Sequence, residues 1–222
     1  MKNWFLYTII LMMIGCHPSG KEVEFVFEVP EFSKEKLDAR TKLVLSPSLY
    51  LDWVNDRGNG LCRSKEVSQV LYNLKFKPFE YIICQELGKE NITSKEFKEN
   101  YSELTGMTYF NFQIQVTDQS NEFLKYAPTN RMSYQERVMY CSFQMQNDIK
   151  LVVGLDSLPC SMYHFERTYG ITPYGNFIIG FQELPIAPEY TFVFSDNLFA
   201  NGIIKFSFKR ELLTNVPKLK TT

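Results

Sequence analysis

The sequence is poor in the residues and motifs on which most catalysis depends. Its 222 residues include two histidines, His17 and His164. It contains no GxSxG nucleophile turn, no HExxH zinc motif, no Walker phosphate loop and no dinucleotide fingerprint. No cysteine spacing matches a CxxC metal or redox motif. We therefore expect a protein that is not an enzyme and that uses no metal and no cofactor.

The sequence also lacks clustered charge of one sign, internal repeats and long apolar segments. Its 24 basic and 25 acidic residues are interspersed and give a formal net charge of −1. Nucleic-acid binding requires a clustered basic surface, so we expect no nucleic-acid partner. The N-terminal apolar run, residues 4–14, is shorter than the roughly 20 residues that a membrane-spanning helix needs.

The N-terminal segment instead has the features of an export signal. Lys2 supplies a positive charge before the apolar run. The segment ends on Met13-Ile14-Gly15-Cys16, which resembles the lipobox of bacterial lipoproteins, although Met13 stands where leucine is more usual. The resemblance implies that residues 1–15 are a signal peptide and that Cys16 becomes the lipidated N-terminus of the mature chain.

The same resemblance carries expectations about location. A lipid-modified Cys16 implies attachment to a membrane by acyl chains, with no membrane-spanning helix in the mature protein. Residues 16–21 form a short polar tether. His17 replaces the aspartate that the family associates with inner-membrane retention in some bacteria, which favours the outer membrane. We therefore expect a protein of the cell envelope, anchored by its lipid.

Without Cys16, four cysteines remain, and their even number is typical of disulfide-bonded exported proteins. They are Cys62, Cys84, Cys141 and Cys160. We expect at least one disulfide, although the three possible pairings stay open. The alternative is four free thiols, because cysteine is also a common small core residue.

The rest of the sequence favours an α+β fold dominated by antiparallel sheet, either a sandwich or an open barrel-like sheet. Alternating apolar and polar residues predict strands at 22–29, 108–117 and 202–210. Segments bounded by turn residues predict further strands at 149–154, 161–169, 175–183 and 190–195. Residues 22–215 should form a single domain, followed by a frayed tail at 216–222.

Two helices are expected to pack on this sheet. Residues 64–74 place apolar side chains at i, i+3, i+4 and i+7, which predicts the first helix. Thr93 and Glu96 have the spacing of a capping box and predict the start of the second, which ends at Gly106.

Three further segments are less distinctive. We interpret residues 79–86 as an apolar strand and residues 46–60 as an exposed irregular excursion. Residues 137–146 alternate like a strand, although Ser133 and Glu136 form a second possible capping box. We assign residues 137–146 to a strand.

One cluster could support hydrolysis. His164 and Glu166 are two residues apart in a predicted strand, so their side chains share a face, and Cys160 lies in the preceding turn. A Cys–His nucleophile also needs an oxyanion site and a lowered thiol pKa, and no motif indicates either. A polar sheet face with a disulfide-bonded Cys160 is the simpler interpretation.

Four aromatic residues lie in or beside expected loops, where aromatics can anchor a protein or glycan partner. They are Tyr50, Trp53, Tyr169 and Tyr174. The alternative is that these rings pack beneath their own loops.

Our main hypothesis is a lipid-anchored envelope protein that binds a protein or a glycan without catalysis. The second hypothesis is an immunity or inhibitor lipoprotein that blocks a toxin or hydrolase in the same compartment. The third is a hydrolase that uses His164 and Glu166.

Overall fold

The computed structural model describes residues 25–26, 31–117, 122–128 and 131–222. The lipobox-like segment, Cys16, the tether and most of the predicted strand 22–29 lie outside the described residues. Within that strand, Phe25–Val26 forms β1. None of the helices in the described ranges is long and apolar enough to cross a membrane.

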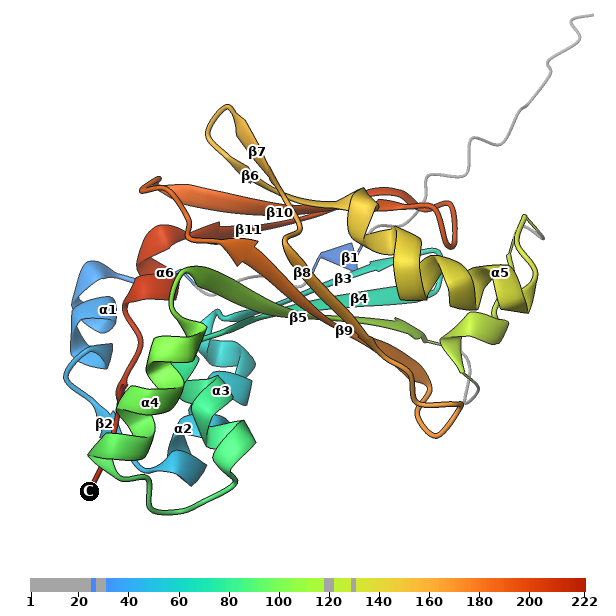
Figure 1. Ribbon diagram of the computed structural model, residues 1–222. Coiled ribbons are helices and arrows are strands. Elements are labelled where there is room, and N and C mark those ends of the chain that lie inside the picture. Colours follow the sequence, from blue (N-terminus) through green and yellow to red (C-terminus); the bar gives the residue numbers. More distant parts are fainter. Residues whose placement is uncertain (1–24, 27–30, 118–121, 129–130) are drawn as a thin grey trace, which may run out of the picture.

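A six-stranded antiparallel sheet forms one layer of the fold (Figure 1). Its spatial order is β1-β3-β4-β5-β9-β8. The strands after β1 are β3 (Cys62–Val67), β4 (Val70–Lys77), β5 (Met107–Val116), β8 (Met162–Glu166) and β9 (Tyr174–Gln182). The strict alternation that predicted a strand near residues 108–117 is confirmed as β5, the central strand that pairs with both β4 and β9.

A four-stranded antiparallel sheet in the order β11-β10-β6-β7 forms the second layer. Its strands are β6 (Ile149–Val153), β7 (Asp156–Pro159), β10 (Glu189–Asp196) and β11 (Gly202–Lys209). The predicted strands at 149–154, 190–195 and 202–210 are confirmed here. The α+β class with a dominant antiparallel sheet is therefore correct, and the arrangement is a sandwich.

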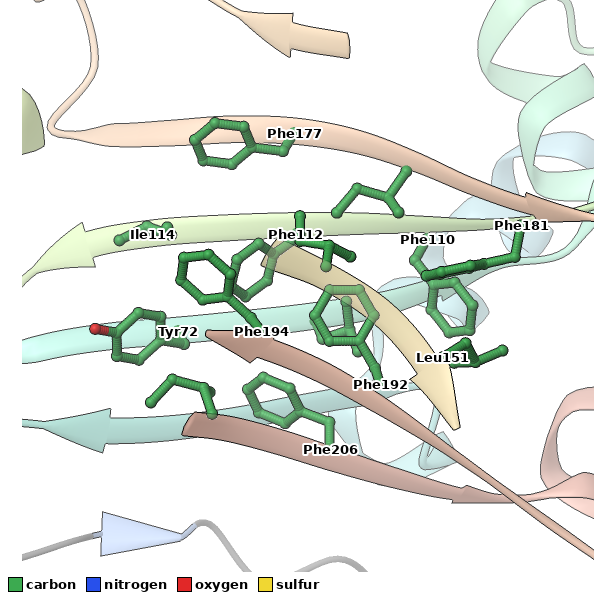
Figure 2. Packing of buried hydrophobic residues seen from close by; sticks show 14 of the residues in the cluster. Tyr72, Phe110, Phe112, Ile114, Leu151, Phe177, Phe181, Phe192, Phe194 and Phe206 are labelled. Carbon is green, nitrogen blue, oxygen red and sulfur yellow. The ribbon is translucent and has the colours of Figure 1, made fainter. Parts of the chain in front are cut away.

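Phenylalanine rings fill the space between the two sheets. Phe112 of β5 lies 5.3 Å from both Phe192 and Phe194 of β10, measured between ring centroids. Phe110 lies 5.7 Å from Phe208 of β11. Figure 2 shows labelled rings from both sheets in this one cluster. Edge-on and tilted ring pairs at these distances stabilise a core beyond their area of burial.

Three helices pack together beneath one end of the six-stranded sheet (Figure 1). They are α2 (Pro47–Asn55), α3 (Phe79–Leu87) and α4 (Ser94–Leu104). Phe79 packs edge-on against both Tyr101 of α4 and Tyr109 of β5, with ring centroids 5.2 and 6.1 Å apart. These contacts attach the helices to the outer face of the sheet. Because the helices lie under one end, they cover only part of that face (Figure 1). The capping box of Thr93 and Glu96 is confirmed at the start of α4.

The remaining helical elements are short. They are α1 (Lys34–Arg40), α5 (Tyr134–Met139), α6 (Arg210–Thr214), three 3₁₀ turns (Arg57–Asn59, Phe123–Lys125, Met145–Asp148) and a π-helical turn (Tyr140–Gln144). The strand assigned to 137–146 is wrong. The Ser133–Glu136 capping box starts α5 there, and its hydrogen bonds outweigh the alternating pattern.

The helix predicted at 64–74 is also wrong, because β3 and β4 form a hairpin there. Its apolar residues fit a helical spacing, but Val70, Tyr72 and Leu74 also alternate and are all buried. The turn is made by Ser68 and Gln69, which both have positive φ angles of 48° and 66°. Tight hairpin turns usually use Asn or Gly, so this one gives no signal in the sequence.

Three other expectations are corrected. Residues 79–86 form helix α3, whose C-cap Gly88 adopts the left-handed conformation. The excursion at 46–60 is helix α2 followed by a 3₁₀ turn. The tail does not fray, because β12 (Lys218–Leu219) pairs in parallel with β2 (Val44–Leu45).

Candidate functional site

The outer face of the six-stranded sheet carries a row of polar side chains that crosses five strands. The register pairs Ser64 with Asn73, Asn73 with Gln113, Gln113 with Asn176, and Asn176 with Glu166. Side chains at paired positions point to the same face of a sheet. The flanking residues on β4, β5 and β9 point inward to the phenylalanine core, so this row faces outward.

A second row lies beside the first. Lys75 pairs with Asn111, Asn111 with Ile178, and Ile178 with His164. Lys77, two residues beyond Lys75 on β4, also points outward, and it is half-buried. This part of the sheet therefore presents amides and ammonium groups with little apolar surface.

Helices α2 and α3 form a wall along these rows. Two hollows of about 200 Å³ each lie between the wall and the sheet, and they adjoin because both are lined by Lys75 and Asn111. We call this surface the sheet trough and define it by Asn73, Lys75, Lys77, Tyr81, Asn111, Gln113, Glu166 and Asn176.

Hydrogen bonds hold the wall to the sheet. Asn55 Oδ1 accepts hydrogen bonds from Lys75 Nζ at 2.5 Å and from Tyr81 Oη at 3.1 Å. Gln85 Nε2 donates to Tyr81 Oη at 3.2 Å. The Tyr81 side chain is thereby fixed at the junction of α2, α3 and β4, where it lines the trough from the helix side.

Several polar groups of the trough keep hydrogen-bonding capacity. Asn111 Nδ2 donates to Asn176 Oδ1 at 2.8 Å, and Asn176 Nδ2 donates to Glu166. Asn73 Oδ1 accepts a hydrogen bond from Ser64 Oγ at 2.5 Å. Within the described residues, the Gln113 side chain and Asn73 Nδ2 have no hydrogen-bond partner. The trough therefore offers both donors and acceptors to a polar ligand.

Two ammonium groups converge on the Tyr81 ring. Lys75 Nζ lies 5.5 Å and Lys77 Nζ 5.7 Å from its centroid, within cation–π range. Burial lowers the pKa of Lys77, Glu166 and Glu86 raise it, and the neighbouring charge of Lys75 lowers it further. Lys77 makes no hydrogen bond or close ion pair with another residue in the described part of the chain.

The structure places two of the three residues of the predicted hydrolytic cluster on one exposed face. His164 and Glu166 share the outward face of β8, and Glu166 lines the trough. Cys160 donates from Sγ to the carbonyl oxygen of Met162 at 3.1 Å. Burial raises the pKa of Cys160 to about 11. The Cys160 thiol therefore stays protonated near neutral pH, which disfavours its use as a nucleophile.

The four aromatic residues expected in loops lie at two separate places. Tyr50 is wholly buried in α2, with an exposed fraction of 0%, so it is not a contact residue. Trp53 is half-buried in the same helix, where Arg40 stacks 5.4 Å from its ring. Tyr169 is 75% exposed in the β8–β9 loop. Tyr174 pairs with Gln115 and so points outward, one row beyond Asn176.

The expectation of a disulfide is wrong, because all four cysteines are free thiols. The four cysteines lie in different segments of the fold and contact different residues. Cys62 Sγ lies 3.8 Å from the carbonyl oxygen of Val54, and Cys84 is buried within α3. Cys141 is buried in the π-helical turn. The described residues contain no group of three or more side chains that could hold a metal ion.

Most of the trough was missed from the sequence. The outward positions of β5, including Asn111 and Gln113, were visible as the polar half of the alternation. Asn73 was hidden because residues 64–74 were assigned to a helix, and Lys75 directly follows that segment. The alternation of Val70, Tyr72 and Leu74 was the one signal in the sequence that could have indicated that Asn73 and Lys75 point outward.

A scan of protein-family models, a search of curated proteins and a search of solved structures each find no significant match to this chain. Its function must therefore be argued from the trough and from the N-terminal sequence.

Proposed function

We propose that this protein is a lipid-anchored, non-catalytic binding protein of the bacterial cell envelope, and that it binds a glycan in the sheet trough. The observation that carries the proposal is the pair of polar rows with open hydrogen-bonding groups, such as Gln113 and Asn73 Nδ2.

The chemistry of the trough suits a saccharide. Sugar hydroxyls both donate and accept hydrogen bonds, and amides offer both functions in one group. Ammonium groups add donors, and Glu166 adds acceptors. A hydrocarbon ligand would leave these groups unpaired at a considerable cost in free energy.

The supporting elements suit recognition without catalysis. Asn73, Asn111, Gln113 and Asn176 stand on paired strands whose opposite faces pack in the phenylalanine core. Groups on strands are held more precisely than groups on loops, which reduces the entropy lost on binding. His164 is exposed on β8, as is Glu166 two residues further on, and the raised pKa of Cys160 disfavours that thiol as a nucleophile.

The proposed anchor follows from the sequence alone. If Cys16 is lipidated, the short tether at 16–21 keeps the folded domain close to the membrane surface. A glycan ligand would then be met at that surface. Feeding cells a clickable fatty acid should label the wild-type protein and leave the Cys16→Ala variant unlabelled. Equal labelling of both proteins would show that Cys16 is not the lipid site.

The glycan proposal can be tested on an array of neutral and acidic oligosaccharides. We expect the soluble domain to bind a subset of them, and Gln113→Ala to weaken that binding about tenfold. The Gln113 side chain has no described hydrogen-bond partner, so its removal should not unfold the protein.

Gln182→Ala is the matched control. Gln182 is exposed on the outward face of β9 but lies outside the two hollows. It should leave binding unchanged. If the wild type binds no saccharide, or if both variants behave alike, the glycan proposal is wrong. A protein ligand would then have to be sought, for example by testing whether the lipoprotein protects cells against a toxin.

A further inference from the structure

We propose that the ligand of the sheet trough is an acidic saccharide, and that its carboxylate or phosphate group binds between Lys75 and Lys77 beside the Tyr81 ring. This inference rests on the proposed function and adds the charge and the position of the group that anchors the ligand.

The first argument is the unsatisfied charge of Lys77. Lys77 is half-buried, and its ammonium group lies beside the Tyr81 ring and makes no hydrogen bond or close ion pair with a described residue. Withdrawing an ammonium group from water without a partner costs free energy. Three N–H donors therefore remain available, and an oxyanion satisfies several of them at once.

The second argument is the proximity of a second cation. Lys75 Nζ approaches the same ring at 5.5 Å, compared with 5.7 Å for Lys77. The charge of Lys75 repels that of Lys77, and one anion in contact with both ammonium groups would replace this repulsion with two attractions. Lys75 is held in place by its hydrogen bond to Asn55 Oδ1 at 2.5 Å.

The third argument is the position of the nearby carboxylates. Glu166 and Glu86 both act on Lys77 from a distance, and neither lies close enough to form an ion pair with it. Glu166 is instead bound by Asn176 Nδ2 and lies at the β8 edge of the trough. Glu166 should accept hydrogen bonds from ligand hydroxyls and repel an acid placed too near that edge. The acid is therefore directed to the helix side.

The adjoining amides explain why the anion should belong to a saccharide. Gln113 and Asn73 lie in the neighbouring hollow, within the same trough, with free donors. A bare phosphate or carboxylate ion would leave them unused. A sugar that carries an acid can fill both hollows, with its acid between the lysines and its hydroxyls on the amides.

The test compares acidic probes with their neutral counterparts by isothermal titration calorimetry. Trigalacturonate is compared with its fully methyl-esterified form, and phosphorylated maltotriose with maltotriose. We expect each acid to bind at least about tenfold more tightly than its neutral counterpart. The pair with the larger ratio of acidic to neutral affinity identifies carboxylate or phosphate as the anchoring group. Equal affinity within both pairs would overturn the inference.

Single substitutions test whether Lys77 binds the acid group of the ligand. Lys77→Gln should reduce affinity for the acid about tenfold and leave affinity for the neutral probe unchanged, while Lys77→Arg should retain binding. Glu166→Gln should strengthen binding of the acid about threefold, because it removes a repelling charge. Lys150→Gln, on an exposed position of β6 in the other sheet, is the matched control for net charge and should have no effect.

The outcomes separate this inference from the proposed function. If neutral saccharides bind and Lys77→Gln has no effect, the acidic anchor is wrong and the glycan function stands. If acidic probes bind but Lys77→Gln and Lys150→Gln weaken them equally, the site between the lysines is wrong. If no saccharide binds at all, both proposals are wrong.

Discussion

Asp196 connects the two sheets through one buried carboxylate, and its removal should strongly destabilise the fold. Its Oδ2 accepts from Tyr72 Oη of the other sheet at 2.6 Å and from the Asn201 amide at 3.3 Å. Its Oδ1 accepts from the amides of Leu198 and Phe199 at 3.0 and 3.1 Å. The Asp196 side chain therefore accepts hydrogen bonds from three backbone amides of the β10–β11 turn and one from Tyr72 of β4.

The magnitude follows from the donors that Asp196→Ala would leave behind. The Tyr72 hydroxyl and two backbone amides would lose their acceptor in a buried place. Each unsatisfied buried donor costs about 1–3 kcal/mol, and water entering the vacated space recovers part of that cost. We expect a loss of about 3–5 kcal/mol in the free energy of unfolding, which is a large share of the stability of a typical domain.

Urea unfolding followed by circular dichroism measures this loss. Tyr72→Phe removes one of the four donors to Asp196 and also the hydroxyl that accepts from Asn201 Nδ2, and it should cost about 1–2 kcal/mol. Asp156→Ala, at an exposed position of β7, is the control and should change stability by less than about 0.5 kcal/mol. If Asp196→Ala costs no more than Asp156→Ala, the reasoning about the buried carboxylate is refuted.

Two further predictions concern packing and pH. Gly175→Ala should lower the free energy of unfolding by about 1–3 kcal/mol, because a methyl group there would overlap the Phe123 ring. Adding Phe123→Leu should recover part of this loss. An unchanged urea midpoint for Gly175→Ala would contradict the prediction. The hydrogen bond from Lys89, with those from Thr93, lowers the pKa of Glu96 to about 2, so its contribution to stability is present above pH 4.5 and is lost as the pH falls towards 2. Carboxyl NMR titration checks this, and a midpoint near 4.5 would contradict it.

The sequence predicted those parts of the fold whose local signal has one interpretation. In β5, apolar and polar residues alternate strictly from Phe110 to Val116, and this alternation favours a strand. In α4, Thr93 and Glu96 satisfy each other's backbone groups, so the start of the helix is encoded within four residues.

In segments whose apolar spacing fits both a helix and a strand, contacts with residues far away in the chain determine which of the two forms. Residues 70–74 satisfy both a helix and a strand, and pairing with β5 selected the strand. The apolar segment at 79–86 became a helix that packs on α2, with Gly88 as its left-handed cap. Gly88 was a usable signal for a helix end, whereas packing on α2 could not be foreseen from local sequence.

The sheet trough could not be predicted, because it depends on the register of five strands at once. A slip of one residue in any pair would turn that strand's polar side chains towards the core. Only the assembled sheet places Ser64, Asn73, Gln113, Asn176 and Glu166 in one row.

The period of two along β5 also separates stability from recognition. Phe110, Phe112 and Ile114 point into the core and are wholly buried, whereas Asn111 and Gln113 point into the trough. Truncating an inward phenylalanine removes many ring contacts and should cost about 3–5 kcal/mol, whatever the protein binds. Truncating Gln113 removes no described hydrogen bond and should change binding alone. One strand therefore allows the core and the proposed binding surface to be altered independently.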